Sequence, residues 1–273
     1  MVSTARGSGQ SFSFDQVFSV SSTQNEVYDG ISDLIQSSLD GYRVCIFSYG
    51  QTGSGKTHTM TGNFEDEGII PRSVKHILGQ SIDLRKMNGW QITLNVSIVE
   101  LYNEEVRDLL SNTHVSSESQ NKLKISFSQG RVSISGIKYE NIPINDLESG
   151  MEKLNKLLSQ SAKSRTIAST GMNDRSSRSH VLFMLEISCT HQNGTVIQGG
   201  LKLVDLAGSE RLDRTGTIND AVRLKETVNI NKSLSSLADV FSALSNKASH
   251  VPYRNSKLTL LLQVNLLYYI CCL

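Results

Sequence analysis

Eight residues decide the fold class of this chain: Gly50-Gln51-Thr52-Gly53-Ser54-Gly55-Lys56-Thr57, which match the pattern G-x-x-x-x-G-K-[ST]. They follow the short apolar run 44–47, which is typical of a buried strand. Glycines allow backbone N–H groups to turn inward around phosphate oxygens, and a following helix adds its positive N-terminus. The pattern therefore predicts a phosphate-binding loop, in which Lys56 reaches the β- and γ-phosphates and Thr57 offers its hydroxyl to Mg²⁺. The alternative is a glycine-rich surface turn.

The composition is that of a folded protein without a strong charge bias. The chain has 273 residues, of which 38% are hydrophobic and 19% are charged, and 27 basic side chains nearly balance 26 acidic ones. This composition can build a core and excludes disorder of the whole chain and collagen-like repeats. A general binder of polyanions usually carries a larger basic excess, so we expect any acidic partner to meet a local patch.

The cysteines and apolar segments indicate a soluble protein of the cell interior. The four cysteines have neither zinc-site spacing nor the density of a disulfide scaffold, which favours reduced thiols. Residues 1–10 are polar and lack the apolar stretch of a signal peptide. The most apolar segment, 258–273, is shorter than the roughly 20 residues that span a membrane. We expect a cytoplasmic location and no membrane partner.

Apolar periodicity predicts strands that alternate with helices. Alternation predicts strands over 91–101 and 181–189, and short apolar runs predict strands over 44–47 and 201–206. A turn at 191–194 is expected to join the strands 181–189 and 201–206 as a hairpin. A second hairpin is expected within 122–139. Helical spacing predicts helices over 147–158 and 222–244, the first with a capping box of Asn145 and Glu148. This order predicts an α/β sheet that is covered on both faces.

Two further segments fit a nucleotide site but are ambiguous when taken alone. The strand 201–205 ends in Asp205, as the acidic partner of a bound metal should, and Gly208 follows where its N–H could approach a γ-phosphate. A strand-terminal cap also explains Asp205. Residues 173–180 read N-D-R-S-S-R-S-H, a hydroxyl-rich loop with an embedded arginine. A helix cap or a phosphorylated loop explains these residues equally well.

Taken together and in this order, the three segments resemble the kinesin motor domain. The resemblance is nearest to the minus-end-directed class that carries its motor at the C-terminus, and it extends over about 11–263. It rests on GQTGSGKT, NDRSSRSH and DLAGSE, and on the runs FSFDQVF at 12–18, GYRV at 41–44, ELYNE at 100–104, NINKSL at 229–234 and HVPYRNSKLT at 250–259. It implies an α/β nucleotide-hydrolase fold with a central mixed, mostly parallel sheet and helices on both faces.

The resemblance implies a role for each matched residue. Ser176 and Ser177 would close on the γ-phosphate and Mg²⁺, while Asp205 would reach Mg²⁺ through water. Arg178 and Glu210 would form a salt bridge around the attacking water, and Gly208 would sense the γ-phosphate. His58 would pack near adenine, and Asn231 would tie the long helix to these loops.

The implied activity is ATP hydrolysis with Mg²⁺ that drives movement along microtubules. The tubulin-facing surface would include the segment 250–262 and the long helix from about 222, with the basic side chains Lys225, Lys232, Lys247, Arg254 and Lys257. For an individual lysine, a solvated helix face is an equally good explanation. No nucleic-acid partner is implied, and a longer parent protein could dimerise through a coiled coil outside these residues. A P-loop GTPase is disfavoured because no N-K-x-D motif occurs.

The two ends depart from the family pattern. Residues 1–10 lack the usual R-x-R-P strand and are expected to be disordered, and residues 264–273 read as an apolar tail outside the family. The sequence therefore predicts a partial motor domain over 11–263 that lacks the family's first and last strands. Because unpaired core strands are costly, the alternative function is a truncated fragment that binds tubulin or nucleotide without turnover. The run 266–270 is the one candidate for the vacant strand position.

Overall fold

The computed structural model describes residues 11–111, 123–128, 130–168, 175–210, 221–267 and 269–273. A twisted sheet runs through the centre in the order β3-β2-β7-β8-β1-β9, and β6 also pairs with β2, over residues 94–96. The expected disordered start at 1–10 lies outside the described residues. The strands are β1 (Arg43–Ser48), β2 (Trp90–Tyr102), β3 (Glu105–Asp108), β6 (Glu140–Ile142), β7 (His180–His191), β8 (Val196–Asp205) and β9 (Tyr269–Cys272).

The sheet is mixed, as predicted, but parallel pairing is concentrated around one strand rather than spread over most of the sheet. β1 runs parallel to β8 and to β9, whereas β2 is antiparallel to β3, β6 and β7, and β7 is antiparallel to β8. The reason is local, because the predicted turn at 191–194 joins β7 and β8 as a long hairpin, and hairpin partners are antiparallel.

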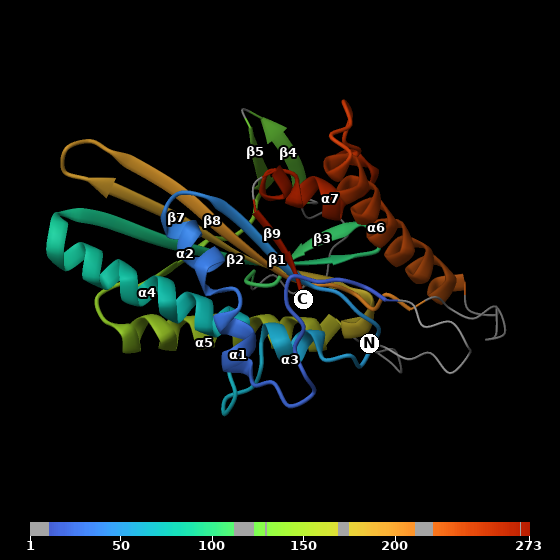
Figure 1. Ribbon diagram of the computed structural model, residues 1–273, viewed down its shortest axis with the longest axis horizontal. Coiled ribbons are helices and arrows are strands. Elements are labelled where there is room, and N and C mark those ends of the chain that lie inside the picture. The colour runs from blue at the N-terminus through green and yellow to red at the C-terminus, as the bar shows by residue number, and fades with distance from the viewer. Residues whose placement is uncertain (1–10, 112–122, 129, 169–174, 211–220, 268) are drawn as a thin grey trace.

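Helices cover both faces of the sheet (Figure 1). Side chains of β1 alternate between the two resulting cores: Val44 and Ile46 belong to one, Cys45 and Phe47 to the other. Burial on both faces explains why β1 is a continuous apolar run. The first face carries α1 (Gln24–Asp29), α2 (Ser32–Leu39), α4 (Ile69–Asn88) and α5 (Leu147–Ala168), and the second carries α6 (Ala221–Ser245), α7 (Lys257–Leu262) and a small hairpin of β4 (Lys124–Ser128) and β5 (Arg131–Ser135).

α5 starts at Leu147, as predicted, but its capping residue lies one position later than predicted. The side chain of Asp146, rather than Asn145, accepts a hydrogen bond from the Ser149 N–H at 2.7 Å. Asn145 instead accepts a hydrogen bond from Arg85 on α4 at 3.4 Å. Both residue types cap helices well, so the choice between neighbours depends on the backbone path that enters the helix.

The prediction that the sheet has no strand after the long helix is wrong for the described residues. β9 pairs in parallel with β1, with Val44 opposite Tyr269 and Phe47 opposite Cys272. The ladder continues to the last residue, because the Leu273 N–H donates to the Phe47 carbonyl at 2.9 Å. The short helix η3 (Asn265–Leu267) leads from α7 into this strand. The strand pairs the edge of β1 that β8 does not cover, which is why the apolar tail is ordered there.

No helix in the described part of the chain combines the length and the apolar character needed to cross a membrane.

We predict that β9 stabilises the strand that leads into the glycine-rich loop. Deletion of 268–273 leaves one edge of β1 unpaired, and at about 1 kcal/mol per lost hydrogen bond the thermal midpoint should fall by roughly 5 °C or more. Cys272→Ser is the matched control, because this exposed side chain changes while the backbone ladder is retained. An unchanged midpoint after the deletion, measured by circular dichroism, would show that the β1–β9 pairing contributes nothing.

Candidate functional site

The glycine-rich loop begins where β1 ends, and the strand register places an acidic residue beside it. Ser48 at the end of β1 lies opposite Asp205 at the end of β8. The loop then turns through Gly53 and Gly55, whose φ angles of 78° and 95° lie in the left-handed region that favours glycine. A Cβ atom at either glycine would meet no atom within 4 Å, so both face open space. This geometry leaves room for phosphate oxygens against the loop backbone.

A hydroxyl and a carboxylate meet at the start of α3 (Lys56–Met60). The Thr57 hydroxyl donates to Oδ2 of Asp205 at 2.6 Å, and the Ser48 hydroxyl lies 3.5 Å from Oδ1 of the same carboxylate. Asp205 is only 8% exposed. Oxygen ligands of this kind suit Mg²⁺, which binds proteins through few side chains and completes its shell with water and phosphate. The donor set therefore fits the magnesium predicted from sequence.

The lysine of the loop is held by the loop itself. The Lys56 ammonium donates to the carbonyl oxygens of Gly50 at 3.0 Å and Gln51 at 2.8 Å. A cavity of about 270 Å³ opens beside it, lined by Thr52, Gly53, Gly55, Lys56, Thr57, His58, Ser177, Asp205 and Leu206. The structure thus brings together the predicted loop, Asp205 and Ser177 around one space, which has the size of a small-ligand site.

The segments after β8 and before β7 are joined through their backbones. The Gly208 N–H donates to the Ser177 carbonyl at 2.9 Å, and the Ser209 N–H donates to the Gly50 carbonyl at 3.0 Å. A Cβ atom at Gly208 would press against the Glu210 carboxylate and the Thr52 hydroxyl, so a larger residue would have to displace these two side chains. Ser176 lies in the short helix η1 (Arg175–Arg178), but its side chain is outside the described part of the structure.

The predicted Arg178–Glu210 salt bridge is not present in this structure. Arg178 pairs with Glu226 of α6, with 2.7 Å between Nη1 and Oε2, and the Tyr102 hydroxyl donates to the other oxygen of Glu226. The Glu226 side chain is only 5% exposed, and a buried carboxylate is costly without a cation. Arg178 is the cation that satisfies it here.

Glu210 is bound instead by the glycine-rich loop. Its carboxylate accepts hydrogen bonds from the Thr52 N–H at 2.8 Å and from the Thr52 hydroxyl. Partial burial acts to raise the pKa of Glu210, but the Thr52 hydrogen bonds and the nearby Lys56 ammonium hold that pKa below its usual value. Glu210 therefore stays ionised and tied to the loop.

Two contacts at the site involve residues that sequence reasoning did not name. The Gln24 side chain from α1 donates to the His58 carbonyl at 2.8 Å and lies 3.2 Å from the His58 ring nitrogen Nδ1, so α1 fixes the residue that follows the loop lysine and threonine. His180 lies between the segment after β8 and Ser233 of α6. The position of His180 at the end of N-D-R-S-S-R-S-H was its only sequence signal.

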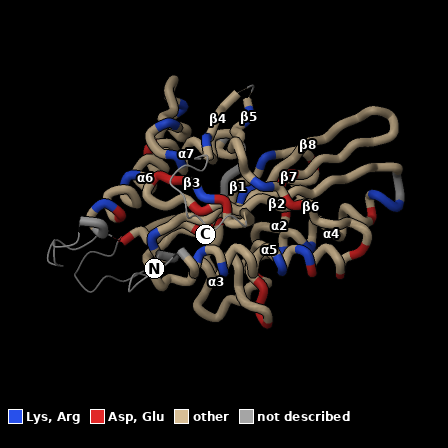
Figure 2. The backbone as a smooth tube through the Cα atoms, turned by 180° about the vertical axis from the view of Figure 1, so that it is seen from behind, with Lys and Arg blue, Asp and Glu red and all other residues tan. Residues whose placement is uncertain are grey.

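The predicted basic surface lies on α6 and around α7. Lys225, Lys232, Lys247 and Arg254 are exposed, while Lys257 is half-buried and its N–H donates to Glu104 at 2.9 Å. Acidic positions lie among the basic ones along α6 (Figure 2).

The exposed side of α6 also carries large apolar side chains. Leu224 is 53% exposed and Val228 is 56% exposed, one helical turn apart. Asn231, which was predicted to tie this helix to the nucleotide loops, is exposed, and Glu226 and Ser233 make those contacts instead.

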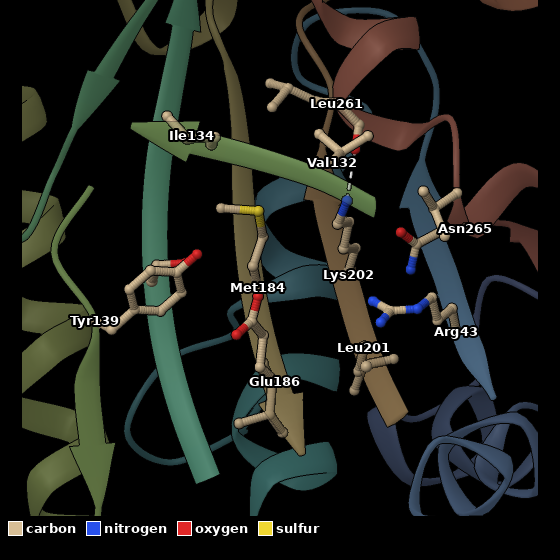
Figure 3. Close-up of a pocket in the computed structure, with 14 residues that line it drawn as sticks. Arg43, Val132, Ile134, Tyr139, Met184, Glu186, Leu201, Lys202, Leu261 and Asn265 are labelled. Atoms are coloured by element: carbon tan, nitrogen blue, oxygen red, sulfur yellow. Dashed lines mark hydrogen bonds between the residues drawn. The ribbon is translucent and has the colours of Figure 1, made fainter. Parts of the chain in front are cut away.

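A second, smaller cavity lies between the sheet, α7 and the β4–β5 hairpin (Figure 3). Lys202 points into it and donates to the Leu261 carbonyl at 2.5 Å, and burial lowers the pKa of this lysine from 10.5 to about 8. Asn265 is buried and donates to the Val44 carbonyl at 3.0 Å, while its amide oxygen has no partner among the described residues. The cavity measures about 40 Å³, which suits a few water molecules rather than a nucleotide.

Comparisons with known proteins agree with this geometry. Residues 2–268 match the family model of the kinesin motor domain, a longer stretch than the 11–263 expected from the motifs. The kinesin-like protein KIN-14D of Arabidopsis thaliana is 47% identical over 265 residues, which are 94% of this chain and 33% of that protein. The kinesin-like protein klpA of Emericella nidulans is 45% identical over 266 residues, 96% of this chain and 33% of that protein. The chain thus spans about a third of these curated relatives.

Solved structures give the same result. The motor domain of the Kar3-like kinesin from Ashbya gossypii has a TM-score of 0.77 at 38% identity and covers 95% of this chain and 76% of its own. The structure of a fast kinesin has a TM-score of 0.81 at 34% identity, and the match covers 96% of this chain and 72% of that structure's chain. The likeness to the class with a C-terminal motor is confirmed, since KIN-14 proteins and the C-terminal motor domain of Kar3 from Candida glabrata are among the matches.

We predict that His180 makes stability depend on pH. Burial lowers its pKa from 6.5 to about 4, so between these values the unfolded chain binds a proton that the folded chain does not. The free energy of unfolding should therefore fall as the pH drops from 6.5 to 4, with up to about 3 kcal/mol due to this residue. In His180→Gln the urea-unfolding free energy should fall less over that range. Equal losses in both proteins would contradict the assignment.

Proposed function

The chain belongs to the kinesin motor domain family, and from this premise we propose that it is the ATP-hydrolysing motor of a microtubule-based protein. The observation that carries the proposal is the Thr57–Asp205 contact beside the glycine-rich loop. It joins the two side chains that would hold Mg²⁺ at the point where the loop would hold phosphates. The comparisons give no support to the non-motor alternative.

Different residues of the site would have different roles in phosphoryl transfer. The loop backbone and Lys56 would bind the phosphates, and Thr57, Ser177 and Asp205 would hold Mg²⁺, with Asp205 acting through water. A bound magnesium ion would supply charge neutralisation on the phosphate oxygens. Gly208 would present its N–H to the γ-phosphate, since the neighbouring Ser209 N–H bonds to the Gly50 carbonyl of the loop. Gln24 would hold His58 toward the adenine side of the loop.

We further propose that turnover requires Arg178 to change partners. In this structure Arg178 pairs with Glu226 and Glu210 binds Thr52, so all three charged groups are satisfied in an open arrangement. A γ-phosphate near Gly208 would draw Ser177 and Glu210 inward, and Arg178 could then exchange one carboxylate for another at little net cost. Such an exchange would release Glu226 of α6, which links the nucleotide state to that helix.

The partner surface is the exposed side of α6 together with the segment around Arg254. Lys225, Lys232 and Arg254 supply positive charge, and Leu224 and Val228 supply exposed apolar area one helical turn apart. An acidic protein surface such as that of tubulin fits both features, although the net charge of the chain is only +1. The cytoskeleton is accordingly the proposed location.

The motor would act within a longer protein. One similar solved structure is the C-terminal motor and motor homology domain of Kar3Vik1 fused to a synthetic heterodimeric coiled coil, which is 37% identical to this chain. By analogy we propose that a longer parent protein dimerises through a coiled coil.

ATP turnover with and without microtubules tests the proposal. Microtubules should accelerate turnover, and Arg178→Ala and Glu210→Ala should each lower the accelerated rate by about 100-fold or more. ATP affinity should change little, because neither side chain lies in the phosphate loop. The double variant should be no slower than the slower single variant, since the two residues act as one pair.

Arg131→Ala is the control for loss of an arginine, because Arg131 lies on the β4–β5 hairpin and bonds to Gln198. It should keep the rate of the unmodified chain. Losses that multiply in the double variant would refute the paired role, and the absence of any acceleration by microtubules would refute the proposed function itself.

A further inference from the structure

His180 closes the motif N-D-R-S-S-R-S-H, and neither the nucleotide site nor the partner surface uses it. It is the first residue of β7 and is 3% exposed. Its ring lies between the backbone after β8 and the buried side of α6, where Ser233 is 2% exposed. A buried imidazole between two elements calls for an explanation, because burial of a polar ring is costly unless both nitrogens are bonded.

The hydrogen bonds around the ring form a continuous chain. The Ala207 N–H donates to Nδ1 of His180 at 3.0 Å, so Nδ1 is an acceptor and carries no proton. The other ring nitrogen, Nε2, then holds the proton and donates to the Ser233 hydroxyl at 2.8 Å. That hydroxyl donates in turn to the Ile230 carbonyl at 2.8 Å. Each group has one role, and only the neutral ring with its proton on Nε2 fits all three bonds.

This chain connects the nucleotide loops with α6. Ala207 lies between Asp205, which binds Thr57, and Gly208, which binds the Ser177 carbonyl. On the helix, Ser233 lies seven residues after Glu226, so the two project from the same side. The loops therefore contact α6 at two places about two helical turns apart.

The two contacts differ in kind. Arg178–Glu226 is an ion pair whose arginine is 28% exposed and has a long, flexible side chain. His180–Ser233 is neutral, fully buried and made by a rigid ring whose two nitrogens face opposite elements. The first contact can exchange partners, whereas in the second contact both ring nitrogens of His180 are already bonded, one to the Ala207 N–H and the other to the Ser233 hydroxyl.

We propose that His180 and Ser233 are positioning residues, which form a fixed joint that transmits movement of α6 to the backbone of 205–208. Partner binding on the exposed side of α6, at Leu224, Val228 and Lys232, would thereby reach the groups that hold Mg²⁺ and sense the γ-phosphate. This inference rests on the proposed function, since it assumes that the exposed side of α6 binds microtubules.

The test separates coupling from nucleotide binding. Ser233→Ala removes the acceptor for the ring N–H, whereas Ser37→Ala removes a hydroxyl that donates to the Asp33 carbonyl of its own helix, α2, on the other face of the sheet. With Ser233→Ala we expect ATP affinity and turnover without microtubules to change by less than about threefold, while the acceleration by microtubules falls by about tenfold or more. Ser37→Ala should behave like the unmodified chain, and Ser233→Thr, which retains a hydroxyl, should recover much of the acceleration.

His180→Asn provides a second variant if Ser233→Ala lowers the folded fraction. The shorter amide keeps an acceptor near Nδ1 for the Ala207 N–H but does not reach Ser233, so it should show the same selective loss. Acceleration that survives in both Ser233→Ala and His180→Asn would overturn the joint while leaving the proposed function intact. If microtubules do not accelerate the unmodified chain, the proposed function fails, and the joint fails with it.

Discussion

β1 and β8 run parallel with Ser48 opposite Asp205, and the positions of the other groups in the site follow from that register. Parallel strands end at the same edge of the sheet, so the loop that leaves β1 and the segment that leaves β8 begin side by side. A shift of one residue would turn Asp205 to the other face and separate it from Thr57. The register is secured because β1 is buried on both faces, between the α1–α5 layer and the α6–α7 layer.

The loops around the nucleotide site also contact α6 directly. Its inner side carries a buried carboxylate and a buried hydroxyl, Glu226 and Ser233, and both are satisfied by residues of the segment that leads into β7. Its outer side carries exposed apolar and basic side chains. One helix therefore has a polar inner contact with the site and an outer surface suited to a partner. This division gives a physical route between ATP and the partner surface.

Local patterns in the sequence predicted much of the fold and the core of the site. Contacts between residues far apart in the sequence were harder to predict. Strict alternation predicted β2 and the β7–β8 hairpin, and glycine spacing predicted the loop that meets Asp205. The pairing of Arg178 with Glu226 could not be predicted, because it depends on which side of α6 faces the sheet. β9 overlaps the run 266–270, the candidate for the vacant strand position, but the sequence alone could not show that this run pairs with β1.

The proposed ATPase site requires that Thr57 and Asp205 hold the same magnesium ion, and the Mg²⁺ dependence of ATP binding tests this directly. By calorimetry, excess Mg²⁺ should strengthen ATP binding to the unmodified chain by at least about tenfold. Asp205→Asn and Thr57→Val should each remove most of that gain, while Thr57→Ser, which retains the hydroxyl, should keep it. If Mg²⁺ strengthens ATP binding to Asp205→Asn as much as to the unmodified chain, the Thr57–Asp205 contact is not the metal site.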